Sequence, residues 1–206
     1  MQEACRISDL GFEKTVPYIK AGVTEGELRT ILEGAMLEGG AEGKSFDTIV
    51  ASGWRSAYPH GTATDKVIEE GDLITFDFGA IYHGYHSDIT RTVAVGEISE
   101  RQRYIYDAVL GCNEHIEKIL KAGLVAADVD QESRKYLKEK ELDQWFGHAL
   151  GHSVGLEIHE TPALSPRDHT VLCSGMTETV EPGVYIPGVG GVRIEDTVVI
   201  EKDGIS

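Results

Sequence analysis

Positive charge is scarce in this chain of 206 residues. Its 19 Lys and Arg stand against 35 Asp and Glu, which gives a formal net charge of −16. A nucleic-acid groove needs a basic footprint, so this balance argues against that class of protein. Bound cations would neutralise part of the excess negative charge, and we therefore look for groups of acids that could bind them.

Long apolar runs are also missing. No stretch approaches the roughly 18 apolar residues of a membrane-spanning helix. No charged and then apolar leader precedes Gly11, so a signal peptide is not supported. We expect a cytoplasmic protein.

Cysteines are few, odd in number and widely spaced. Cys5, Cys112 and Cys173 cannot form a disulfide framework, and we expect buried, reduced thiols. Linkers and low-complexity segments are absent as well. Because the chain is long enough for one sizeable core, we expect a single domain over residues 1–206.

One pattern of glycines and acids occurs twice in the chain. In each copy a Gly lies six positions before an acid, another Gly lies two positions after it, and a second acid follows a turn that contains Gly. The residues are Gly71, Asp77, Gly79 and Asp88 in the first copy, and Gly175, Glu181, Gly183 and Glu195 in the second. Glu181 lies 104 positions after Asp77, which predicts two similar halves.

The spacing predicts that each copy is a β-hairpin. The midpoint of 77 and 88 falls at 82.5 and that of 181 and 195 at 188, both in segments with Gly that suit a turn. We expect each hairpin to bring its acids side by side, with Cβ atoms about 4.5–5.5 Å apart. Such like charges repel unless a cation binds. The alternative is four acids on a solvated strand face.

Helices are expected to flank both hairpins. Apolar spacing and capping boxes at Thr24 and Ser99 indicate helices, and apolar runs indicate strands. The expected helices cover 3–20, 25 to Gly39-Gly40, 100–121 and 128–140, and the expected strands cover 48–52, 73–78, 89–95, 177–180, 184–186 and 198–200. This order predicts an α+β fold with repeated halves.

Histidines are concentrated between the hairpins. His148, His152 and His159 lie in a Gly-rich segment, and His60 lies in a turn-like segment after Pro59. Four carboxylates and at least one imidazole suit two divalent ions such as Mn²⁺, with Co²⁺, Fe²⁺ or Zn²⁺ as alternatives. Two ions about 3.5–4 Å apart activate water and stabilise charge on a carbonyl oxygen. The residues therefore predict metal-assisted hydrolysis.

These motifs resemble the pita-bread metallopeptidases of family M24, which include methionine aminopeptidase, Xaa-Pro aminopeptidase and Xaa-Pro dipeptidase. The resemblance runs from about Ile7 to Ile200. It implies a curved, mainly antiparallel sheet in pseudo-two-fold halves covered by helices. The metal ligands that it implies are Asp77, Asp88, His152, Glu181 and Glu195.

The resemblance also implies roles around the metals. His60 and His159 would contact the scissile group, and Glu181 would accept the proton of the attacking water. Tyr185 and Arg193 would organise the site. His148 would either lie near the leaving residue or support its own loop.

Two short sequence motifs resemble those of the proline-specific branch of the family. Pro59-His60-Gly61 and Glu181-Pro182-Gly183 differ from methionine aminopeptidases, which have Cys before that His and Met after Glu-Pro. We therefore expect an aminopeptidase or dipeptidase acting on peptides with proline at the second position, with methionine aminopeptidase or a non-catalytic scaffold as alternatives. Proline-specific members carry an N-terminal domain that is absent here, and a homodimer is the assembly that the resemblance allows.

Overall fold

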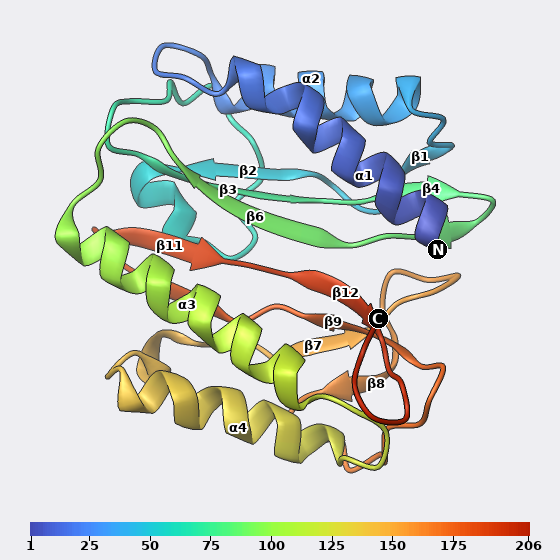
Figure 1. Ribbon diagram of the computed structural model, residues 1–206. Coiled ribbons are helices and arrows are strands. Elements are labelled where there is room, and N and C mark those ends of the chain that lie inside the picture. Colours follow the sequence, from blue (N-terminus) through green and yellow to red (C-terminus); the bar gives the residue numbers. More distant parts are fainter.

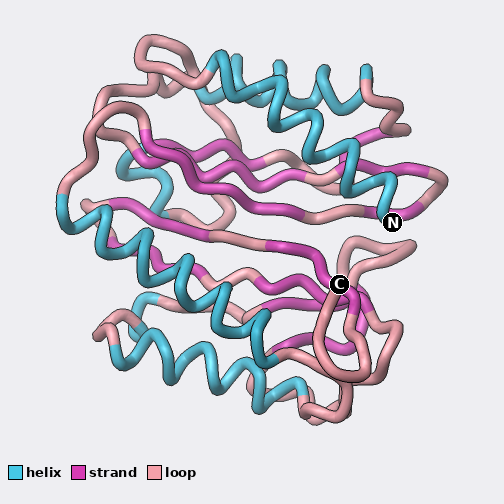
Figure 2. Tube along the Cα trace, in the orientation of Figure 1, coloured by secondary structure: helices cyan, strands magenta, loops and turns pink.

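The computed structural model describes residues 1–206, which form two α+β halves facing each other (Figure 1). Helices α1 and α2 lie on the outside of the first half, and helices α3 and α4 lie on the outside of the second (Figures 1 and 2). The strands of both halves therefore meet in the middle of the molecule. Each half has its own buried apolar cluster between strands and helices, around Phe76 and Phe78 in the first and around Ile116 and Val180 in the second.

The first half contains two α-helices, a three-stranded antiparallel sheet in the order β2-β3-β6 and a second small sheet in the order β1-β4-β5. Its elements are α1 (Gln2–Thr15), η1 (Val16–Tyr18), α2 (Glu25–Glu38), β1 (Gly43–Lys44), β2 (Ile49–Ser52), η2 (Gly53–Ala57), β3 (Leu73–Phe78), β4 (Ala80–Tyr82), β5 (Tyr85–His86) and β6 (Ile89–Ala94).

The second half contains two α-helices, a four-stranded antiparallel sheet in the order β12-β9-β7-β8 and the hairpin β10-β11. Its elements are α3 (Glu100–Ile119), α4 (Ala126–Glu139), η3 (Asp143–Trp145), β7 (Gly151–Ser153), β8 (Glu160–Leu164), β9 (Thr177–Val180), β10 (Gly183–Ile186), β11 (Gly190–Arg193) and β12 (Asp196–Val199).

Local capping signals set the helix starts. Thr24 and Ser99 each accept a hydrogen bond from the backbone N–H three residues later, and both predicted capping boxes are complete. The predicted extension of the first helix to residue 20 is wrong. Helix α1 ends at Thr15 because Pro17 has no N–H to continue the ladder, and a 3₁₀ turn follows.

The register of the first hairpin differs from the prediction by one pair. Its turn is His83-Gly84, with φ of 51° and 77°, and positive φ at both positions is what a two-residue type I′ turn requires. Gly84 suits the second position, which moves the centre of the hairpin from 82.5 to 83.5. Asp77 therefore lies opposite Thr90, not opposite Asp88.

The second hairpin has the predicted register. Val180 pairs with Asp196, and Gly183 pairs with Arg193. The same register places Glu181 opposite Glu195, so these two acids lie side by side as expected.

A single bridge joins the sheets of the two halves. Thr90 of β6 pairs with Glu195, whose backbone N–H donates to Thr90 O at 3.1 Å. Next to it, Thr92 Oγ1 donates to Arg193 O at 2.8 Å. The two halves thus keep separate sheets that are linked at the seam by this bridge.

The cysteines match the expectation only in part. All three are free, with Cys112 buried, Cys5 half-buried and Cys173 exposed, so the prediction of a buried thiol is wrong for Cys173. No helix is both long and apolar enough to cross a membrane.

Candidate active site

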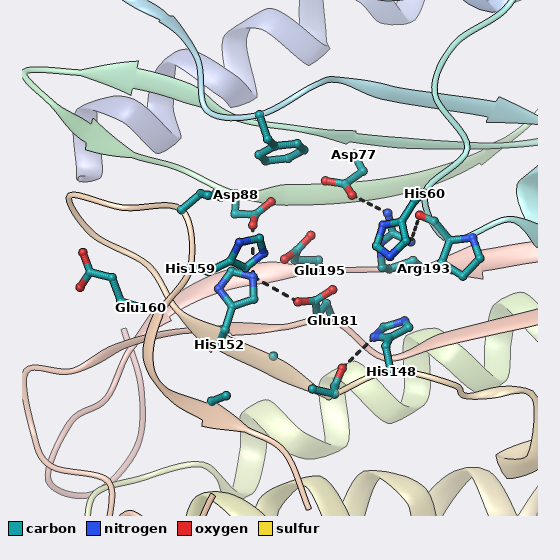
Figure 3. Close-up of a pocket in the computed structure, with 16 residues that line it drawn as sticks. His60, Asp77, Asp88, His148, His152, His159, Glu160, Glu181, Arg193 and Glu195 are labelled. Carbon is teal, nitrogen blue, oxygen red and sulfur yellow. Dashed lines mark hydrogen bonds and ion pairs between the residues drawn. The ribbon is translucent and has the colours of Figure 1, made fainter. Parts of the chain in front are cut away.

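A cavity of 460 Å³ opens between the two halves at the seam. It is lined by nine of the ten residues that the sequence analysis singled out, and Figure 3 shows them around one space. They are His60, Asp77, Asp88, His148, His152, His159, Glu181, Arg193 and Glu195. Tyr185, the tenth, lies behind this lining and is 7% exposed.

Strand register brings the acids together. Asp77 lies opposite Thr90, Thr90 pairs with Glu195, and Glu195 lies opposite Glu181, so these residues form one row across the seam. Asp88 precedes Thr90 by two positions. Because side chains alternate along an extended chain, Asp88 and Thr90 project from the same face, toward the row.

One group has the spacing of a metal site. Ligand atoms of Asp88, His152 and Glu195 all lie within 4.8 Å of one another. His152 Nε2 is 3.5 Å from both Asp88 Oδ2 and Glu181 Oε1. His152 Nδ1 lies 3.0 Å from Ser153 O, which is a hydrogen bond if Nδ1 carries the proton and leaves Nε2 free as a ligand.

Burial keeps the His152 imidazole in the form that binds metals. Desolvation lowers the pKa of His152, and the neighbouring His159 lowers it further. A neutral ring with a free Nε2 is therefore favoured at this position.

Among the carboxylates that line the cavity, two buried oxygens lack any hydrogen-bond partner, Asp77 Oδ1 and Glu195 Oε1. The other oxygen of each group is engaged, since Arg193 Nη2 donates to Asp77 Oδ2 at 2.5 Å and Thr90 Oγ1 donates to Glu195 Oε2 at 2.6 Å. A buried oxygen without a donor is unfavourable unless a cation binds it. The donor set therefore fits divalent metal ions.

The electrostatics of the cluster support the same conclusion. Burial raises the pKa of Asp88 and Glu195 well above the ordinary range, and repulsion from the neighbouring carboxylates adds to it. Burial also raises the pKa of Glu181 to about 8, although Arg193 opposes this shift. Glu195 is 1% and Asp88 7% exposed, so the alternative of four acids on a solvated face is wrong.

A hydrogen-bond chain runs behind the acids. Arg193 Nη1 donates to Tyr185 Oη at 2.8 Å, and Tyr185 Oη is 2.8 Å from His148 Nε2. His148 Nδ1 is 2.7 Å from Ala149 O, so a ring protonated at Nδ1 accepts from Tyr185. Burial lowers the pKa of His148 to about 4, which favours this neutral form. Both ring nitrogens of His148 therefore have hydrogen-bond partners within the protein, which favours the interpretation that His148 supports its own loop.

His60 and His159 lie on opposite sides of the acid cluster in Figure 3. His60 comes from the first half and His159 from the second. The His159 ring packs edge-on against His152, with centroids 4.4 Å apart. The two histidines therefore flank the place where the acids converge.

Sequence reasoning missed Thr90 and Thr179. Thr90 connects Glu195 with Arg193, whose Nε donates to Thr90 Oγ1 at 3.1 Å. Thr179 Oγ1 accepts from His152 N at 3.0 Å and donates to Glu181 Oε1 at 3.2 Å. Each Thr lies two positions from an acid of the cluster, and that alternation is the signal that could have found them.

The sequence pattern of metallopeptidase family M24 matches residues 1–202. The chain belongs to this family. It is 48% identical over 204 residues to the Xaa-Pro dipeptidase of Pyrococcus furiosus, covering 99% of this chain and 59% of that protein.

Solved structures of similar proteins have the same fold. The Xaa-Pro dipeptidase from Bacillus anthracis matches with a TM-score of 0.98 at 51% identity, covering 99% of this chain and 57% of that one. The X-Pro aminopeptidase from Thermotoga maritima matches with a TM-score of 0.96 at 48% identity, with coverage of 99% and 57%. The α+β pita-bread fold is thereby confirmed. This chain spans less than two thirds of each of these relatives.

Proposed function

We propose that residues 1–206 form a catalytic domain that hydrolyses the peptide bond between an N-terminal residue and proline. The observation that carries the proposal is the convergence of Asp88, His152 and Glu195, with Asp77 and Glu181 beside them, in one cavity of an M24 metallopeptidase. Relatives named Xaa-Pro dipeptidase and X-Pro aminopeptidase support proline specificity and leave both modes of cleavage as part of the proposal.

Asp77, Asp88, His152, Glu181 and Glu195 would hold two divalent ions, for which we propose Mn²⁺. When bound, such ions lower the pKa of water and polarise a carbonyl oxygen. The unpartnered oxygens Asp77 Oδ1 and Glu195 Oε1 support the fit of this donor set.

The protein groups of the site would divide the remaining work. Glu181 accepts a proton from the attacking water, because its carboxylate lines the cavity 3.5 Å from His152 Nε2. His60 and His159 donate hydrogen bonds to the oxygen on which charge develops. Arg193 fixes Asp77, and Tyr185 fixes Arg193 in turn.

Turnover of Xaa-Pro peptides tests the proposal. The chain is reconstituted with Mn²⁺, its metal content is measured, and release of free Xaa is followed from Xaa-Pro dipeptides and from longer Xaa-Pro peptides. We expect turnover of at least one group, and cleavage of dipeptides alone would assign a dipeptidase.

A Met-Ala-Ser peptide serves as the matched control because it lacks proline. Turnover of that peptide in place of the Xaa-Pro peptides would assign methionine aminopeptidase activity. Folded protein with two bound ions and no turnover of any peptide would overturn the proposal and support a non-catalytic scaffold.

A further inference from the structure

His60 lies in a segment that is anchored mainly by side-chain hydrogen bonds and less by pairing between strands. Residues 52–64 leave the end of β2, pass through η2 and carry His60 to the cavity. Apart from Ser52, which ends β2 and pairs with Ile74, the only residue of the segment in a bridge is Thr62, which pairs with Ile49. The position of the His60 imidazole therefore depends on the groups that anchor residues 52–64.

Glu25 binds both ends of this segment. Its side chain is 0% exposed and lies at the first residue of α2. Its Oε1 accepts from Ser52 N at 2.8 Å and Ser52 Oγ at 2.9 Å. Its Oε2 accepts from Thr64 N at 3.0 Å and Thr64 Oγ1 at 2.8 Å, and also from Arg55 Nη1. One carboxylate thus joins the beginning of the segment to its end.

The middle of the segment has separate anchors. Gly191 N donates to Ser56 Oγ at 2.8 Å, and Arg193 Nη1 donates to Pro59 O at 3.2 Å. A Cβ at Gly191 would lie 2.1 Å from Ser56 O, so the segment packs directly on β11. These contacts fix the segment against the second half, and Glu25 fixes it to the first.

Glu25 itself does not line the cavity. Its carboxylate is stabilised by the N-terminal end of α2 and by the paired Arg55. An effect of Glu25 on chemistry must therefore pass through the segment that it holds. Displacing a catalytic group by about 1 Å can lower turnover by as much as about 100-fold.

We propose that Glu25 is a positioning residue that holds His60 in its place beside the acid cluster. The inference rests on the proposed function for its kinetic test, but its structural test is independent of turnover. A purely structural role for Glu25 predicts lower stability of the fold and no specific effect on His60.

The first test replaces the carboxylate with an amide. Glu25→Gln keeps the size of the side chain but places an NH₂ group against the donors of either Ser52 or Thr64, which releases one end of the segment. We expect kcat to fall by about 10- to 100-fold with KM changed less than about twofold, while bound metal is retained. Glu27→Gln, in the same helical turn and outside this network, is the matched control and should keep the parental kcat.

The second test asks whether Glu25 acts through His60. In a His60→Ala background, Glu25→Gln should lower kcat little further, because the group that it positions is gone. The proposal would be overturned if Glu25→Gln lowered kcat by the same factor with and without His60. It would also be overturned if folded Glu25→Gln kept the parental kcat. If Glu25→Gln does not fold, Thr64→Val, which removes only the hydroxyl donor, takes its place under the same criteria.

Hydrogen exchange gives the readout that does not need turnover. Amides of residues 53–62 should exchange faster in Glu25→Gln than in the parent and in Glu27→Gln, whereas amides of β3 should not change. Unchanged exchange in residues 53–62 would overturn the proposal. Failure of the parent to cleave any Xaa-Pro peptide would instead overturn the proposed function.

Discussion

The two hairpins carry the same pattern of glycines and acids but present their acids differently. In the second, Glu181 lies opposite Glu195, whereas in the first Asp77 lies opposite Thr90. The cause is the turn, since positive φ at His83 and Gly84 shifts the centre of the first hairpin by one position. The repeated motif therefore predicts which acids lie in the same cavity, whereas the turn sets the register and so decides which residues lie directly opposite each other.

The hairpins differ more strongly on the faces that point away from the cavity. An acid lies six residues after Gly71 and again six residues after Gly175. Three residues after the same glycines, the two copies differ, with Ile74 in the first and Glu178 in the second. Both Ile74 and Glu178 are fully buried. The two copies therefore match at the positions that face the cavity and differ at the positions that are buried in the core.

Removing one acid from each hairpin should give the largest effect. Asp88→Ala and Glu195→Ala should each lose metal binding and turnover together, by at least about 100-fold, because each removes a proposed ligand from the same site. Metal content after dialysis and kcat/KM are the measurements.

Asp196→Asn is the matched control for the acids. Asp196 is adjacent to Glu195 and pairs with Arg91 at the surface, so this variant should retain both metal and turnover. Full metal content in either Ala variant would show that the two hairpins do not contribute equally.

Removing one histidine from each half should separate chemistry from metal binding. His60→Ala and His159→Ala should each keep bound metal and lose about 100-fold in kcat, because each removes one proposed donor to the reacting group. The comparison is made by metal analysis and steady-state kinetics, with the exposed His169→Ala as control. Normal kcat in either variant would refute the role of that histidine.

The buried Glu178 should give the second half a pH dependence that Ile74 cannot give the first. Burial raises the pKa of Glu178 from 4.5 to about 7, although Ser153 Oγ donates to it. The native state keeps this proton while the unfolded chain releases it, so the contribution is fully present below pH 4.5 and is lost as pH rises through about 7.

Unfolding by urea at several pH values measures this difference. The free energy of unfolding of the parent, relative to Glu178→Gln, should fall by up to roughly 3 kcal/mol between these two pH values. The exposed Glu139→Gln should track the parent. A constant difference between parent and Glu178→Gln would contradict the raised pKa.

The capping boxes of the two halves should give the smallest and most nearly equal effects. Thr24→Ala and Ser99→Ala each remove one side-chain acceptor from a helix N-terminus and should each lower the free energy of unfolding by about 1 kcal/mol. Thermal or urea unfolding measures both. A much larger loss for Thr24 would show that α2 depends on its cap more than α3 does.

Local signals in the sequence were sufficient for several elements. The capping boxes at Thr24 and Ser99 predicted the first residues of α2 and α3, and apolar runs predicted the bounds of β3 and β9. These signals depend on residues only a few positions apart, so a single sequence is enough to recognise them. The prediction missed six strands of two to five residues, which are too short to give a clear pattern: β1, β4, β5, β7, β8 and β11.

Contacts across the seam could not be predicted in the same way. Arg193 binds Asp77 across 116 positions, and Thr90 binds Glu195 across 105. Nothing in the local pattern states how the two halves align, because that alignment depends on packing between them. His152 was identified as a candidate ligand by resemblance to a family, since its spacing from the acids carries no signal of its own.

The bridge between Thr90 and Glu195 also bears on how the protein folds. Closing a chain loop of 105 positions is entropically unfavourable until both ends are already ordered. We therefore expect contacts within each half to form before the contacts across the seam. A chain with only one half folded would bring together two of the four carboxylates and would lack the complete acid cluster, so the cluster depends on the docking of the two halves.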